Sequence, residues 1–147
     1  DQVEFQVSAH SGLPLRPLAK VASGGELSRI SLAIQAITSR VAAVPTLIFD
    51  EVDAGIGGKV AEIVGRMMNR RGRERQVMCV THLPQVAAAG DHQWRVTKST
   101  ADGAVASRVA VLDSRERVEE IARMLGGIRI TETTRKHAAE MLGVGEG

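Results

Sequence analysis

The chain has 147 residues, 44% of them hydrophobic and 24% charged, which is enough for one globular domain with its own core. Its net charge of +2 permits an anionic partner without requiring one, and an aromatic content of 2% argues against a nucleic-acid platform of stacked bases. A single cysteine excludes an internal disulfide, and no apolar run approaches the roughly 18 residues of a membrane span, so we expect a cytoplasmic protein without a membrane partner.

The N-terminal region has few signals of regular structure. The chain starts at Asp1 rather than Met and enters a predicted strand at residues 3–7 almost at once, so we expect a fragment of a longer protein. Residues 11–21 contain Gly12, Pro14 and Pro17, which interrupt regular structure and predict a loop.

A helix is predicted to begin at Gly24 and Gly25. Its buried face is marked by apolar residues at helical spacing, namely Leu27, Ile30, Ile34, Ile37 and Val41. Ser23 and Glu26 match a capping box, in which both side chains satisfy free amide groups of the first turn. The same N-terminus, with two glycines that carry no side chain, could present amides to a phosphate. From this motif alone, capping is the simpler interpretation.

The strand predicted at residues 46–49 is the centre of the functional argument. Its residues are β-branched or apolar, which predicts burial on both faces, and it ends in two adjacent carboxylates, Asp50 and Glu51. The carboxyl ends of parallel strands open onto the ligand crevice of an α/β sheet, so one carboxylate can serve a metal ion and the other a water molecule. This arrangement is typical of a nucleotide hydrolase.

A second strand, predicted at residues 76–81, ends next to His82. Cys79 lies inside this apolar run, so we expect a buried and inert thiol. His82 would face the same crevice as Asp50 and Glu51. A lone histidine is more often a cap or simply exposed than catalytic, but two strand ends that agree are a stronger signal than either alone.

Between these strands the sequence predicts a tight glycine loop and a helix that ends at Gly72. The apolar face of this helix is formed by Val60, Ile63, Val64, Met67 and Met68. The run Gly57-Gly58-Lys59-Val60 looks like part of a phosphate-binding loop, but it ends in Val instead of a hydroxyl residue and follows no strand directly. It is not a P-loop.

The C-terminal part is predicted to hold a hairpin and two helices. Strands at residues 92–97 and 105–112 flank a turn centred on Asp102-Gly103. Asp113 with Glu116 is expected to cap a helix that closes at Gly126-Gly127, and a last helix is predicted at residues 132–142. The apolar face of the capped helix is formed by Val118, Ile121, Ala122 and Leu125.

Phosphoryl transfer needs a cradle for the phosphates, a metal ion, a positioned water and additional positive charge. Asp50 is the candidate ligand for Mg²⁺, Glu51 the candidate base for the water, and His82 a candidate contact for the γ-phosphate of ATP. Ser23-Gly24-Gly25 could donate to the same phosphate. The cradle is missing, so we expect the chain to bind ATP poorly without another segment that supplies it.

The order of these motifs resembles that of an ABC-type ATPase head. Residues 22–26 are similar to its signature motif, residues 47–51 to its Walker B strand, Asp53 to its D-loop and His82 to its switch histidine. Residues 18–29, 49–58, 80–88 and 119–127 look like the RecN family of bacterial SMC-like DNA repair proteins, and the resemblance extends from about residue 13 to 142. Glu26, where transporter-type domains have Gln, separates the chain from transporters.

The resemblance implies an α/β fold in which residues 1–147 form the C-terminal lobe of an ABC/SMC-type P-loop ATPase head, with a mostly parallel sheet flanked by helices and a β-hairpin. In that family the two ends of one long chain assemble the head, and a coiled coil lies between them. The N-terminal half, which carries the Walker A loop, and a second head in a homodimer are therefore expected partners.

In such a dimer the two heads sandwich ATP and Mg²⁺. The resemblance implies that Asp50, Glu51 and His82 serve their own head and that Asp53 lies at the dimer seam. The signature residues would contact the nucleotide bound to the opposite subunit; they are Ser23, Gly24, Gly25 and Glu26.

The implied function is ATP hydrolysis coupled to DNA binding in double-strand break repair and recombination, close to the bacterial nucleoid. The chain alone is predicted to be inactive. The alternatives are a non-catalytic docking or DNA-binding scaffold that retains the fold, and a transporter ATPase subunit, which Glu26 disfavours.

Overall fold

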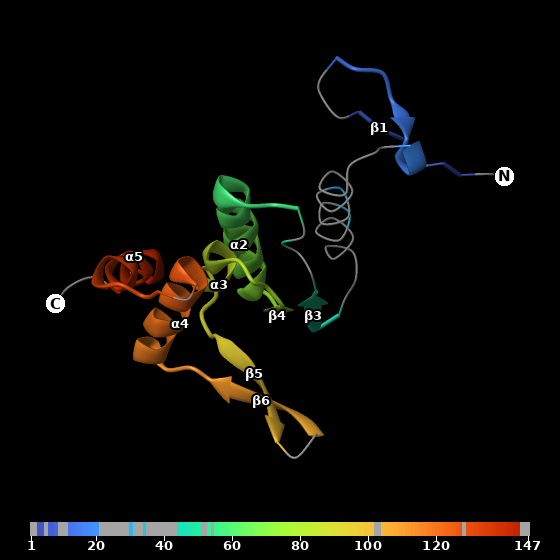
Figure 1. The fold of residues 1–147 in the computed structure, drawn as a ribbon. Helices are drawn as coiled ribbons and strands as arrows, with labels where there is room; N and C mark the ends of the chain where they lie inside the picture. The colour runs from blue at the N-terminus through green and yellow to red at the C-terminus, as the bar shows by residue number, and fades with distance from the viewer. Residues whose placement is uncertain are drawn as a thin grey trace.

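The structure is a computed structural model, and it describes residues 3–4, 6–8, 12–20, 30, 34, 44–50, 53, 55–101, 104–127 and 129–144. Figure 1 shows the course of the chain through these residues. In chain order the elements are β1 (Gln6–Val7), β2 (Arg16–Pro17), η1 (Leu18–Lys20), β3 (Thr46–Phe49), α2 (Gly58–Gly72), β4 (Gln76–Cys79), α3 (Pro84–Ala88), β5 (Trp94–Ala101), β6 (Ala104–Val111), α4 (Ser114–Gly126) and α5 (Glu132–Leu142).

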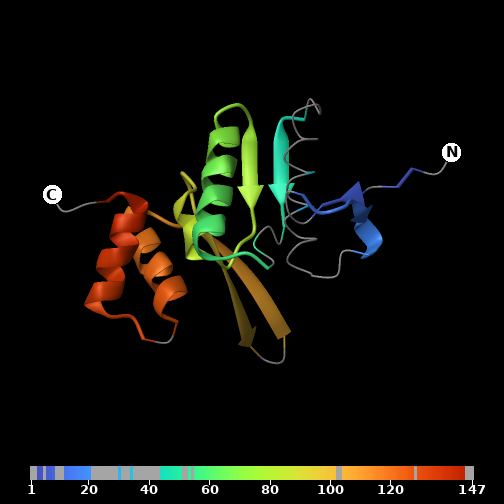
Figure 2. The ribbon, with the colours of Figure 1, turned by 90° about the horizontal axis from the view of Figure 1, so that it is seen from above.

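The centre of the fold is a βαβ unit in which β3 and β4 pair in parallel and α2 connects them. The register runs from Thr46 opposite Gln76 to Phe49 opposite Cys79. Helix α2 lies alongside the pair (Figure 2). Its buried side chains form a core with the strands and α3; the members are Phe49, Ala61, Val64, Met68 and Val86. The predicted α/β class is therefore confirmed, and within the described residues parallel pairing is limited to these two strands.

Burial of β3 differs from the prediction. Ile48 is 69% exposed, whereas Phe49 is 6% exposed, so the strand buries one face and not both. Val80, which directly follows β4, is also 61% exposed. Apolar composition marks a strand that can be buried on both sides, but the structure has α2 packed on one side only.

The buried face of α2 is also shifted from the predicted one. Val60 and Ile63 are exposed, and the residues in the core are Ala61, Val64, Gly65 and Met68. The reason is close packing against α3, because a Cβ atom on Gly65 would lie only 2.8 Å from the Cβ atom of Ala89. Small residues let the two helices approach, and a search for large apolar residues misses such a face.

The N-terminal segment contains more structure than predicted. Of the strand expected at residues 3–7, Gln6–Val7 is observed as β1, which pairs antiparallel with β2. The loop expected at residues 11–21 is wrong in part, since it contains β2 and η1. Of the helix predicted after the glycines, Ile30 and Ile34 are described, and both are helical. The rest of that segment lies outside the described residues.

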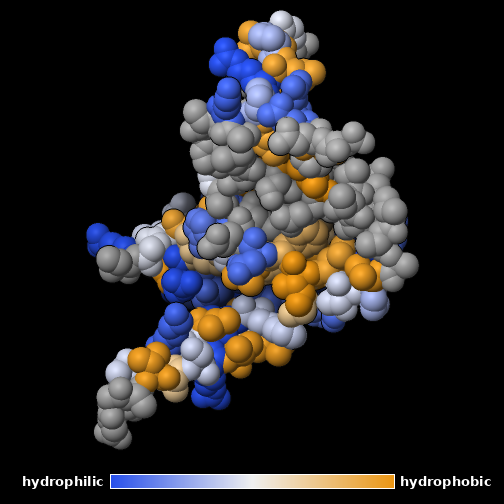
Figure 3. All heavy atoms as spheres, turned by 90° about the vertical axis from the view of Figure 1, so that its right-hand side faces the viewer, coloured by the Kyte–Doolittle hydropathy of each residue, from blue (hydrophilic) through white to orange (hydrophobic). Residues whose placement is uncertain are grey.

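The predicted hairpin is confirmed, with β5 and β6 paired from Trp94 opposite Val111 to Ala101 opposite Ala104. It projects from the body (Figure 1). Side chains alternate between the two faces of a strand, and one face of the hairpin carries five apolar side chains that are each 55–70% exposed. We call it the hairpin apolar face; its residues are Trp94, Val96, Val105, Val109 and Val111. Figure 3 shows hydrophobic atoms on the projecting hairpin, at the lower left of the view.

Helices α4 and α5 begin as their sequences predict. The Asp113 side chain accepts a hydrogen bond from the Glu116 amide at 2.8 Å, and the Glu116 side chain accepts one from the Asp113 amide at 2.9 Å. This confirms the capping box, and α5 spans the predicted residues 132–142. A second cap, formed by Thr131 and Thr134, was not predicted. The two helices bury a separate small core of Ile121, Ala122 and Ala138.

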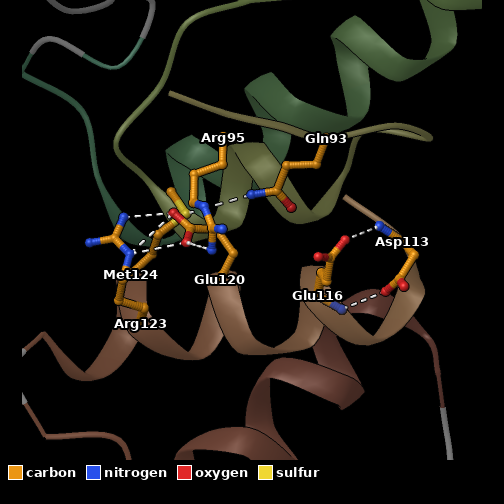
Figure 4. A network of polar contacts seen from close by, with 7 residues as sticks. All are labelled: Gln93, Arg95, Asp113, Glu116, Glu120, Arg123 and Met124. Carbon is orange, nitrogen blue, oxygen red and sulfur yellow. Dashed lines mark hydrogen bonds and ion pairs between the residues drawn. The ribbon is translucent and has the colours of Figure 1, made fainter. Parts of the chain in front are cut away.

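The root of the hairpin is joined to α4 by a buried charge (Figure 4). The Glu120 side chain, 6% exposed, receives a 2.6 Å hydrogen bond from Arg123 and lies 3.8 Å from the Arg95 guanidinium of β5. A buried carboxylate is tolerated when such partners satisfy it. Glu120 therefore fixes β5 against α4.

We predict that Glu120→Gln loosens α4 more than the same change at the neighbouring residue, Glu119→Gln. The first variant keeps the size of the side chain but weakens charge-assisted hydrogen bonds in a buried place, which costs about 1–3 kcal/mol. Glu119 is partly exposed and pairs with Arg135 at 2.8 Å. Its replacement should cost less than about 1 kcal/mol. Hydrogen–deuterium exchange of the α4 amides measures both effects. Equal exchange in the two variants would contradict this role of Glu120.

Candidate functional site

The candidate site lies where β3 and β4 end. Because the strands run parallel and in register, Asp50 after β3 and His82 after β4 leave the sheet at the same edge. A hydrogen bond of 2.9 Å from the Val80 amide to the Phe49 carbonyl continues the ladder to this edge. Asp50 is exposed there. The prediction that these two strands end side by side is confirmed.

The other predicted site residues fall into two groups. Asp53 is described, and it is almost completely buried, with 3% of its surface exposed. Five candidates lie outside the described residues, and their placement and roles stay predictions; they are Ser23, Gly24, Gly25, Glu26 and Glu51.

The Asp53 carboxylate binds the loop that follows β4. Its Oδ2 atom accepts hydrogen bonds from the Thr81 hydroxyl at 2.5 Å and from the His82 amide at 2.7 Å. The Leu83 amide lies 3.3 Å from the same oxygen and also donates to the Thr81 hydroxyl at 3.0 Å. These donors compensate the loss of hydration that burial of a carboxylate entails.

The imidazole of His82 belongs to the same cluster. Its Nδ1 atom is 3.1 Å from Asp53 Oδ2, while the side chain as a whole is 77% exposed. A carboxylate at Nδ1 favours the tautomer that carries its proton there, which leaves Nε2 as the ring atom available to a ligand. Nε2 of His82 can therefore accept a hydrogen bond from a ligand that lies in front of the strand ends, or donate one to it when the ring is protonated.

The ionisation of the cluster follows from its hydrogen bonds. Burial alone would raise the pKa of the Asp53 carboxyl, but the bonds from Thr81 and His82, together with the His82 charge, outweigh burial and hold that pKa below its usual range. Burial, and secondarily the negative charge of Asp53, raise the pKa of the nearby Cys79 thiol to about 11. Cys79 thus remains a neutral thiol at physiological pH, which agrees with the inert role predicted for it.

A magnesium ion fits the donor set at this edge. The described residues contain no group of three or more His, Cys, Asp or Glu side chains that could hold a metal ion by themselves. Mg²⁺ does not need one, because it is commonly held by one or two carboxylates together with phosphate oxygens and water. The exposed carboxylate of Asp50 can be such a ligand.

Sequence reasoning missed the role of Thr81. Thr81 is the last residue of the strand predicted at 76–81, and a hydroxyl residue at a strand end is the only signal that the sequence offers there. Thr81 and Asp53 are 28 positions apart, so their contact arises from the parallel pairing and not from a local motif.

Among the described residues, no helix is both long and apolar enough to cross a bilayer.

No protein-family model matches the chain. Individual relatives do match it. It is 54% identical to the DNA repair protein RecN of Vibrio cholerae, 53% to that of Haemophilus influenzae and 46% to that of Bacillus subtilis, each over 97% of this chain. The chain is thus similar to RecN proteins over nearly its whole length. It spans about a quarter of the length of these relatives, 25–26%.

Two solved structures share the fold of this chain. A chain from a study of "ATP-driven dimerization and DNA stimulated activation of SMC ATPases" superposes with a TM-score of 0.61 over 80% of this chain and 70% of its own, at 21% identity. The Smc head domain of Pyrococcus yayanosii gives a TM-score of 0.59 at 25% identity, over 74% of this chain and 20% of its own. The predicted fold, part of an SMC-type ATPase head, is confirmed.

We predict that the Cys79 thiol reacts slowly in the native protein. A pKa of about 11 leaves a thiolate fraction at pH 8 that is lower by about 100-fold than that of a cysteine with a pKa near 9. Labelling with iodoacetamide, followed by mass spectrometry of the Cys79 peptide, should be slower than in urea-unfolded protein by at least this order. Equal rates in the two states would contradict the partial burial of Cys79.

Proposed function

We propose that this chain is the C-terminal part of the ATPase head of an SMC-like protein that acts in the repair of DNA double-strand breaks. One observation carries the proposal: in a chain that is similar to RecN proteins and has an SMC-head fold, Asp50 and His82 leave neighbouring parallel strands at one edge. Such an edge is where α/β sheets bind nucleotides.

The chemistry assigned to each residue follows from its position. Asp50 would hold Mg²⁺, which when bound neutralises charge on the phosphate oxygens. Glu51, next in sequence, would orient the attacking water and accept its proton. His82, with Nδ1 held by Asp53, would direct Nε2 to the γ-phosphate. The signature residues Ser23 to Glu26 would act on the nucleotide of a second head.

The bare apolar surfaces support the proposal that another part of the protein completes the head. Ile48 and Val80 are exposed on the parallel pair at 69% and 61%, and the hairpin apolar face is exposed by more than half. Apolar area of this kind usually marks an interface. Since the chain spans about a quarter of its relatives, we propose that the N-terminal half of the head, with its phosphate loop, covers these surfaces.

A second head and DNA are the other proposed partners. The structural relative named above is described by its ATP-driven dimerization and its DNA-stimulated activation, and the relatives in sequence are DNA repair proteins. We propose the same dependence on dimerization and DNA for the protein that contains this chain, in the bacterial cytoplasm near the nucleoid.

The variant Glu51→Gln tests this function in the complete protein. It should retain ATP binding and stabilise the ATP-dependent dimer, because the proposed ligand of Mg²⁺ remains, while turnover falls by about 100-fold or more through loss of the base. Light scattering measures the dimer and phosphate release measures turnover. The control is Glu62→Gln, which removes an exposed glutamate of α2 paired with Arg66 and should change neither.

The outcomes separate the two functions considered. Undiminished turnover in Glu51→Gln would remove Glu51 from the mechanism. Absence of any nucleotide effect on dimerization, in the wild-type protein as well, would favour a non-catalytic docking or DNA-binding scaffold.

A further inference from the structure

We propose that Asp53 is a positioning residue that aims the His82 imidazole from within the same chain. The inference rests on the proposed ATPase function and deepens it, because it assigns the D-loop carboxylate a task in its own head. The link is direct: one carboxylate oxygen contacts three consecutive residues after β4 and also the histidine ring.

The backbone contacts fix the path of the loop. Thr81, His82 and Leu83 all direct donors at Asp53 Oδ2, at 2.5, 2.7 and 3.3 Å. A loop whose consecutive amides share one buried acceptor has little freedom to move without leaving that carboxylate unsatisfied. The position of the His82 Cα atom is therefore set by Asp53.

The ring contact fixes the direction of the side chain. His82 is 77% exposed, so packing does little to hold the imidazole, and the polar contact of its ring is the 3.1 Å approach of Nδ1 to Asp53 Oδ2. An exposed side chain without such a contact samples several rotamers, and each immobilised side chain costs about 0.5–1.5 kcal/mol of entropy. With the contact, the ring is already immobilised before the nucleotide binds. One tautomer is favoured, and it leaves Nε2 available to a ligand.

Thr81 supports Asp53 in this task. Its hydroxyl donates to Oδ2 and accepts from the Leu83 amide at 3.0 Å, so it has a fixed donor direction. A hydroxyl that must donate is satisfied best by the carboxylate, which is a stronger acceptor than the protonated acid. Thr81 thereby keeps Oδ2 turned toward the loop.

The position of Asp53 also bears on the seam of the proposed dimer. Its side chain is 3% exposed and its Oδ2 atom is occupied by groups of its own chain. We therefore assign its carboxylate to His82 of the same head, whichever backbone atoms of this segment meet the second head.

The test is a double-mutant cycle in the complete protein with Asp53→Asn and His82→Ala. Asparagine preserves the size of the side chain but is a weaker acceptor and no longer selects one imidazole tautomer. We expect Asp53→Asn to lower kcat for ATP hydrolysis by about 10–100-fold and to change KM by less than about threefold. In the His82→Ala background the same change should have almost no further effect on kcat, because its target is gone.

The matched control is Asp91→Asn. Asp91 is an exposed aspartate that accepts a hydrogen bond from Asn69 at 3.0 Å, away from the strand ends, and its replacement should leave kcat unchanged. Equal losses from Asp53→Asn with and without His82 would overturn the proposal, since a purely structural role adds its cost in both backgrounds. A rise in KM with unchanged kcat would also overturn it.

A second variant covers the case in which Asp53→Asn does not fold. Thr81→Val removes one donor to Oδ2 and keeps the carboxylate, so the same cycle with His82→Ala should show a coupling of the same sign and a few-fold size. Additive effects there would contradict the proposal.

The failure of the proposed function can be told apart from the failure of this inference. If the wild-type protein shows no turnover, the ATPase assignment fails, but ¹⁵N NMR of labelled histidine still reports the His82 tautomer. We expect the Nδ1-protonated form in the wild-type protein and a mixture in Asp53→Asn. The same tautomer distribution in both would overturn the positioning role.

Discussion

The parallel register of β3 with β4 is the constraint on which the rest of the site depends. It places Asp50 and His82 at one edge although 32 positions separate them in the sequence, and it puts the Thr81 hydroxyl 2.5 Å from Asp53. Helix α2 makes this register possible, because a parallel pair needs a crossover, and Gly65 lets that crossover pack closely on α3. The close packing at Gly65 therefore contributes to the arrangement of the two strand ends.

The described residues pair their buried carboxylates but leave several large apolar side chains exposed. The two buried carboxylates of the described residues both have partners, Arg123 for Glu120 and Thr81 for Asp53. Exposed apolar groups remain on Ile48, Val80 and the hairpin apolar face. A chain that pairs its buried carboxylates, yet leaves those apolar side chains in solvent, has the surface expected of a lobe that docks on another part of its protein.

The sequence predicted the features that depend on residues close together in the chain. It did not predict those that depend on which elements pack against each other. The Asp113–Glu116 capping box, α5 and the hairpin follow from residues within a few positions of one another, and they were predicted correctly. The buried face of α2 was predicted in part. Val64 and Met68 are in the core as expected, but Val60 and Ile63 are exposed, and Gly65 packs closely against the segment of α3. The strand ends of the site were predicted, whereas the contact of Asp53 with Thr81 could not be, since only the fold brings them together.

The central claim is that the strand ends form half of a nucleotide site. The most direct measurement is ATP turnover by these 147 residues alone, and again after they are joined to the N-terminal part of their protein. With folding of the isolated chain checked by circular dichroism, the account predicts no turnover alone and restored turnover in the joined protein. Strong hydrolysis by the isolated chain would contradict it, because the phosphate loop would then have to lie within these residues.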